Sequence, residues 1–172
     1  MFLNYIKDFW VKKILKNKLH NVKCSSLVTP IKTVGLLVDE SYFSQKNELI
    51  QELVSNGIQE NNIKVIVFRD KIKKNELNTT AVFSNKNLGW NAHFTDQFLN
   101  EFVDTNFDLL ISYYDQEKAS LLLMTHNSKA LFKVGFSSID KRLNHLMINT
   151  NAENFKVFAH ELFRYLKILN KI

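Results

Sequence analysis

Acidic side chains follow three of the strands that the sequence predicts. Asp39 and Glu40 come after the first strand, Asp70 after the second and Asp115 after the central one. The carboxyl ends of parallel strands share one edge of an open sheet, where ligands bind in this class of fold. Mg²⁺ prefers carboxylate and water oxygens. These carboxylates therefore predict, as one alternative, a metal site in a small Mg²⁺-dependent or nucleotide-using enzyme; the simpler interpretation is that polar residues end strands where the chain meets water.

Other catalytic signatures are missing from the sequence. Four scattered glycines form neither a G-x-G-x-x-G motif nor a P-loop, and the acidic residues after the first strand are expected to repel a pyrophosphate. There is no G-x-S-x-G motif, and the five histidines lack the paired spacing of zinc ligands. A single cysteine, Cys24, allows no intramolecular disulfide. We therefore expect no catalytic residues and no cofactor, with Mg²⁺ entering only if the strand-end carboxylates bind it.

Positive charge is concentrated in the first 23 of the 172 residues. This segment holds six lysines against one aspartate, whereas the rest of the chain holds 17 basic and 16 acidic side chains. Lysines on a helix bind phosphates largely without reading sequence. The segment therefore predicts RNA or a ribonucleoprotein as partner. The residues assigned to this surface are Lys7, Lys12, Lys13, Lys16, Lys18, Lys23 and Trp10.

Residues 1–21 predict one helix with two apolar faces. One face includes Trp10, and the other carries Val11, Leu15 and Leu19. Three interpretations are open: packing on the body of the protein with the lysines in water, docking to RNA or another protein, and lying on an anionic membrane surface with aromatic side chains inserted.

A second aromatic and basic segment spans residues 84–94. It contains Lys86, Trp90 and His93, and aromatic rings beside basic side chains can stack on bases and hold phosphates. Lys86 and Trp90 therefore join the predicted partner-binding residues. The alternative is a loop in which Trp90 and Phe94 hold the connection against the core.

Strands and helices alternate along the rest of the chain. Strands are predicted at 31–38, 63–68, 79–83, 107–114, 130–136 and 144–148, with helices between most of them and a last helix at 152–169. This order predicts a three-layer α/β fold with a mostly parallel, Rossmann-like sheet of five or six strands and an extra basic N-terminal helix. The expected organisation is a helix at 1–23, a linker at 24–30 and a single α/β domain at 31–172.

The location is predicted to be cytoplasmic. No run approaches the roughly 20 apolar residues that cross a bilayer, and lysines interrupt the N-terminal segment where a secretion signal would be apolar.

The segment 106–136 carries the motif Asn-Phe-Asp-Leu-Leu-Ile-Ser-Tyr-Tyr followed by Ser-Lys-Ala-Leu-Phe-Lys-Val-Gly-Phe. It resembles an uncharacterised family of small α/β proteins from Bacteroidetes, which implies a fold without an assigned activity. The same segment is similar to the N-terminal half of lipopolysaccharide heptosyltransferases. Only Asp108, Gly135 and Phe136 match that pattern, at positions that are structural there. Those enzymes need a second Rossmann-like domain, so this resemblance implies the fold and argues against the activity.

The sequence favours a non-catalytic cytoplasmic binding protein, in which an α/β scaffold engages RNA or a ribonucleoprotein such as the ribosome through its Lys-rich helix. The Mg²⁺-dependent enzyme is the alternative. A protein partner and a membrane-surface adaptor are further possibilities, and no transmembrane segment is expected.

Overall fold

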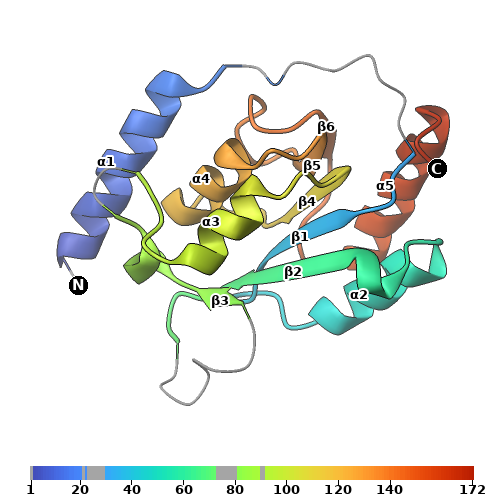
Figure 1. Cartoon of the computed structure of the whole chain (residues 1–172), viewed down its shortest axis with the longest axis horizontal. Coiled ribbons are helices and arrows are strands. Elements are labelled where there is room, and N and C mark those ends of the chain that lie inside the picture. Colours follow the sequence, from blue (N-terminus) through green and yellow to red (C-terminus); the bar gives the residue numbers. More distant parts are fainter. Residues whose placement is uncertain (1, 21, 23–29, 73–80, 90–91) are drawn as a thin grey trace.

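The computed structural model describes residues 2–20, 22, 30–72, 81–89 and 92–172. In these residues six parallel strands form one sheet in the order β3-β2-β1-β4-β5-β6 (Figure 1). The strands are β1 (Val34–Asp39), β2 (Ile63–Phe68), β3 (Val82–Phe83), β4 (Leu109–Tyr113), β5 (Phe132–Phe136) and β6 (Leu146–Ile148). This is the strand order of a doubly wound Rossmann sheet, which confirms the predicted fold class.

Helices cover both faces of the sheet. They are α1 (Phe2–Lys18), α2 (Lys46–Ser55), α3 (Gln97–Asp104), α4 (Ala119–Asn127) and α5 (Phe155–Ile168), with short 3₁₀ turns at η1 (Glu60–Asn62) and η3 (Asn85–Asn87). α2 and α5 pack together on one face, and α3 and α4 on the other, where α1 lies against α4 and η3 (Figure 1). None of the helices in the described residues is long and apolar enough to cross a membrane.

The central strands are buried along their whole length. Every residue of β1, β4 and β5 is shielded from solvent, which is why their sequences read as nearly continuous apolar runs instead of alternating ones. β1 begins at Val34, three residues later than predicted, because Lys32 and Thr33 bind a side chain: their N–H groups donate to Asp108 Oδ2 at 2.9 and 2.8 Å. Asp108 is therefore structural and joins the start of β4 to the start of β1.

Two other predicted segments lie partly or mostly outside the described residues. The predicted strand 79–83 is present only as β3, the two residues Val82 and Phe83, since 79 and 80 lie outside the described residues. Nearly all of the predicted linker at 24–30 also lies outside them.

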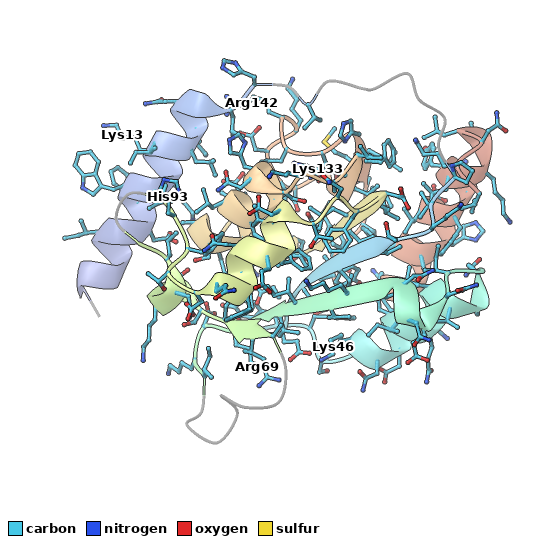
Figure 2. All side chains as sticks on the ribbon, viewed as in Figure 1. Lys13, Lys46, Arg69, His93, Lys133 and Arg142 are labelled. Atoms are coloured by element: carbon cyan, nitrogen blue, oxygen red, sulfur yellow. The ribbon has the colours of Figure 1, made fainter. Side chains whose placement is uncertain are left out.

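Lys133 is a buried lysine that projects from β5 to the end of α4 (Figure 2). Its Nζ donates to the carbonyl oxygens of Thr125 at 2.7 Å and His126 at 3.2 Å, where the helix dipole favours a cation. No carboxylate in the described part of the chain pairs with it. Burial lowers the pKa of Lys133 to about 8, so the charged form of Lys133 lowers the free energy of unfolding.

We predict that the free energy of unfolding rises between pH 7.5 and pH 9.5 by about 2 kcal/mol more in the native protein than in Lys133→Met. The folded-state pKa, about 8, lies below the ordinary value of 10.5. In this window the unfolded chain therefore binds more protons than the folded one, and removing protons favours folding. Below about pH 8 Lys133 is charged in both states, so the full destabilisation from burying its charge is present. Urea denaturation at both pH values measures the difference.

The matched control is Lys129→Met, because Lys129 is exposed and pairs with Asp104 at the surface. It should keep the native pH dependence. The window stops below pH 10 because burial raises the pKa of Tyr113 and Tyr114, so the folded state binds more protons than the unfolded one at higher pH. Equal pH slopes in the native protein and Lys133→Met would contradict the prediction.

Candidate functional site

The carboxyl ends of β1 and β4 form the expected ligand-binding edge. β1 lies between β2 and β4 and is parallel to both. The chain crosses from β1 to β2 on one side and from β4 to β5 on the other, so this edge is a topological switch point, where open α/β sheets bind ligands.

Lys118 occupies this edge. Its Nζ lies 2.7 Å from Asp39 Oδ2 and 3.0 Å from Asp70 Oδ2. The ammonium also sits over the rings of Tyr42 and Phe68, 4.7 and 4.8 Å from their centroids, in a geometry that favours a cation. Its side chain is only 13% exposed. The structure thus brings two of the predicted carboxylates together, around a lysine that the sequence did not single out.

The other strand-end carboxylates point elsewhere. Asp115 Oδ2 accepts a hydrogen bond from the N–H of Ala152 at 2.9 Å, and Glu40 forms ion pairs with Lys46 and Arg69. In the residues described, no group of three or more His, Cys, Asp or Glu is arranged to hold a metal ion. The Mg²⁺ alternative stays a prediction, and a cation at Asp39 and Asp70 would have to displace the Lys118 ammonium.

The N-terminus of α4 is occupied by a carboxylate from α1. Lys118, at the N-cap position, makes no capping hydrogen bond with its side chain, but the N–H of Ala119 donates to Asp8 Oδ1 at 3.0 Å. Asp8 in turn lies 3.3 Å from Lys12 Nζ, which donates to the carbonyl of Glu117 at 2.6 Å. A helix N-terminus attracts anions, so the Asp8 carboxylate supplies the negative charge that the N-terminus of α4 favours.

Arg142 binds the C-terminal end of α1. Its Nη1 donates to the carbonyl oxygens of Lys16 at 3.2 Å and Leu19 at 3.4 Å, which lie at the C-terminus of the helix. Its Nε and Nη2 donate to the two oxygens of Asp140 at 2.9 and 2.6 Å. The hydrogen bond from Arg142 lowers the pKa of Asp140 to about 2. α1 is thus attached to the body of the protein through Asp8 and Lys12 in its middle and through Arg142 at its C-terminal end, where Figure 2 shows Arg142.

The two apolar faces of α1 have different environments. Val11, Leu15 and Leu19 are buried against the body of the protein, which confirms the packing interpretation for that face. Phe9 and Trp10 are 59% and 51% exposed. Two adjacent exposed aromatic rings on an anchored helix form the most distinctive surface feature of this region.

The predicted lysines do not all face solvent freely. Lys12 forms an ion pair with Asp8, and Lys16 Nζ lies 3.4 Å from Glu117 Oε2. Lys13 is exposed on the outer side of α1, 5.5 Å from the centre of the Trp10 ring, and no ion pair involves it in the described part of the chain (Figure 2). The side chains of Lys7 and Lys18 lie outside the described residues, as do Lys23 and Trp90 entirely.

The structure places the two predicted partner-binding segments next to each other. η3, which contains the exposed Lys86, packs against α1. Ser84 caps this turn, and Ser120 Oγ of α4 lies 2.6 Å from Asn85 Oδ1. The exposed residues Phe9, Trp10 and Lys13 of α1 and Lys86 of the adjacent η3 are together called the α1–η3 surface below.

Three residues of this region escaped sequence analysis. Lys118 and Arg142 carry no motif. The carboxylates that pair with Lys118, and the carbonyl groups of α1 that Arg142 binds, lie far away in the chain. Asp8 offered a weak signal, because it is the only acidic residue in a strongly basic helix.

Residues 7–169 match DUF6913, described as a family of unknown function, and the chain belongs to this family. The comparison confirms the resemblance to a family without an assigned activity. No curated protein and no solved structure matches the chain, so neither an origin in Bacteroidetes nor the similarity to heptosyltransferases gains support.

We predict that Lys118→Met lowers the free energy of unfolding by about 3 kcal/mol, because the buried Asp39 loses its counter-charge. In this variant, millimolar Mg²⁺ or Ca²⁺ should raise the melting temperature by filling the gap between Asp39 and Asp70, whereas the native protein should show little response. Thermal denaturation with and without the ions measures both effects. Lys129→Met, which breaks an exposed ion pair, should change stability by less than about 0.5 kcal/mol. A variant as stable as the native protein would contradict the central role of Lys118.

We predict that Arg142→Ala loosens α1, because the variant leaves Asp140 without its partner and removes two donors from the helix C-terminus. Trypsin should cleave after Lys12, Lys13 and Lys16 several-fold faster than in the native protein. Arg164→Ala is the matched control, since Arg164 pairs with a carboxylate on α5 without contacting α1. Equal cleavage rates in the two variants would show that Arg142 does not hold the helix.

Proposed function

We propose that this protein is a non-catalytic, cytoplasmic binding protein that engages RNA or a ribonucleoprotein through its α1–η3 surface. The observation that carries the proposal is the exposure of Phe9 and Trp10 on a helix whose opposite face is fixed to the body of the protein.

The surface has the two components of a sequence-tolerant nucleic-acid site. Exposed rings such as Phe9 and Trp10 can stack on bases, and the exposed Lys13 beside Trp10 and Lys86 on the adjacent η3 can contact phosphates. Stacking of this kind contributes roughly 1–3 kcal/mol per base. Because contacts at Asp8, Lys12 and the C-terminus already hold α1 against the body of the protein, a ligand would not have to order its backbone.

The state of the switch point supports a role without catalysis. Lys118 fills the space between Asp39 and Asp70, and Asp8 fills the anion-binding position at α4. A substrate entering from this edge would have to displace internal ion pairs, whereas a partner on the α1–η3 surface would not.

A membrane-surface adaptor is the second candidate, and the same pair of aromatic residues favours it. Trp and Phe beside lysines can insert into the interface of an anionic bilayer. The two candidates differ in one respect: stacking on bases survives in the absence of lipid, whereas insertion requires it.

We predict that fluorescence-labelled single-stranded RNA binds the native protein and that Trp10→Ala weakens binding roughly tenfold, in keeping with the loss of one stacked base. Lys13→Gln should weaken binding less and reduce its salt dependence. Fluorescence anisotropy over a series of salt concentrations measures both. The matched control is Val157→Ala, because Val157 is an exposed apolar residue on α5, away from the α1–η3 surface.

Two outcomes would overturn the RNA proposal. One is RNA binding that does not have the predicted character: it is absent, does not depend on salt, or is unchanged in Trp10→Ala. The other is binding to phosphatidylserine vesicles that Trp10→Ala abolishes while RNA does not bind, which would establish the membrane candidate instead. Circular dichroism of each variant verifies that the fold is intact.

A further inference from the structure

A cavity of about 450 Å³ opens between the loop after β1 and the end of β2. Its size is typical of sites for small molecules. Its lining residues in the described part of the chain are Glu40, Phe43, Ser44, Lys46, Asn47, Arg69 and Lys71. Figure 2 shows Lys46 and Arg69 at the same border of the molecule, away from Lys13 on α1.

Positive charge dominates the lining. Lys46, Arg69 and Lys71 face one carboxylate, Glu40. Glu40 Oε1 lies 2.8 Å from Lys46 Nζ, and its Oε2 accepts hydrogen bonds from Arg69 Nε at 3.0 Å and Nη2 at 2.6 Å. The single carboxylate thus fixes two cations side by side, and the lining residues that the structure describes have a net charge of +2.

The electrostatics of Glu40 agree with this arrangement. Its side chain is 11% exposed. Burial alone would raise its pKa, but Lys46 and Arg69 together hold the pKa below its ordinary value. Glu40 therefore stays ionised and keeps both cations in place at neutral pH.

These contacts bear on the expectation that acidic residues after β1 repel phosphates, because both carboxylates have cationic partners. Asp39 is neutralised by Lys118, and Glu40 by Lys46 and Arg69. The expectation counted only neighbours in the sequence, whereas the cations come from α2 and from just beyond the end of β2.

The remaining lining residues suit a small polar ligand. Phe43 is buried and forms an apolar wall, and the exposed Ser44 and Asn47 bring a hydroxyl and an amide. The cavity is many times larger than the roughly 30 Å³ that one water occupies. A bare inorganic anion would leave most of it unfilled.

We propose that this cavity binds a small phosphomonoester. Its dianionic phosphate matches the net charge of the lining and lies against Lys46 and Lys71, and the organic part occupies the space beside Phe43, Ser44 and Asn47. The cavity and the α1–η3 surface involve different elements, so this site is independent of the proposed RNA binding.

Isothermal titration calorimetry of the full chain with ribose 5-phosphate, inorganic phosphate and ribose, at constant ionic strength, tests the proposal. Ribose 5-phosphate should bind saturably and more tightly than inorganic phosphate, and ribose should not bind. Lys46→Gln and Lys71→Gln should each raise the dissociation constant roughly tenfold, since each removes a charge-assisted contact. Lys71→Gln leaves the ion pairs of Glu40 intact, so it remains informative if Lys46→Gln fails to fold.

Lys156→Gln is the matched control, because Lys156 is an exposed lysine that lines a different cavity together with Glu48 and Glu52. It should leave binding unchanged. The proposal is overturned if no probe binds saturably, if ribose 5-phosphate binds no better than inorganic phosphate, or if Lys71→Gln binds as the native protein does. Loss of RNA binding in Lys71→Gln, with RNA binding retained in Trp10→Ala, would also overturn it by assigning the cavity to RNA.

Discussion

The ion pairs of Lys118 are the interaction on which this edge of the sheet depends. The Lys118 ammonium at the start of α4 forms ion pairs with Asp39 at the end of β1 and with Asp70 just beyond β2. Without it, the carboxyl group of the nearly buried Asp39 would lose its counter-charge in a poorly solvated position, and breaking a buried ion pair in this way destabilises a fold. The lysine therefore joins three elements at the point where a doubly wound sheet ordinarily leaves room for a ligand.

Contacts of α1 also fill positions at this edge with side chains of the protein itself. Asp8 supplies the negative charge at the N-terminus of α4, and Arg142 supplies donors at the C-terminus of α1. α1 thus contributes to the charge balance of the sheet edge as well as to the core. Internal ion pairs occupy the space between the ends of β1 and β4, whereas the outer side of α1 and the cavity beside α2 are open in the described part of the chain.

The fold was predictable because its signals are local. β1, β4 and β5 are buried on both faces, so each appears as an apolar run, and α5 has one regular apolar stripe. The site was less predictable because its contacts are long-range. Lys118 lies just before α4 in a segment without a recognisable motif, and no periodicity in the sequence indicates that it forms an ion pair with Asp39. Likewise, both apolar faces of α1 fit a buried helix, and only the position of α4 determines that Val11 is buried while Trp10 is exposed.

Charge content alone also overstates what α1 offers a partner. Six lysines in the first 23 residues indicate a strongly basic surface, yet Lys12 and Lys16 approach Asp8 and Glu117. Ion pairs at a surface reduce the number of counterions that a bound phosphate chain can release, and counterion release drives much of the affinity for nucleic acids. Binding through this helix would therefore depend on the exposed rings of Phe9 and Trp10 more than on the lysine count.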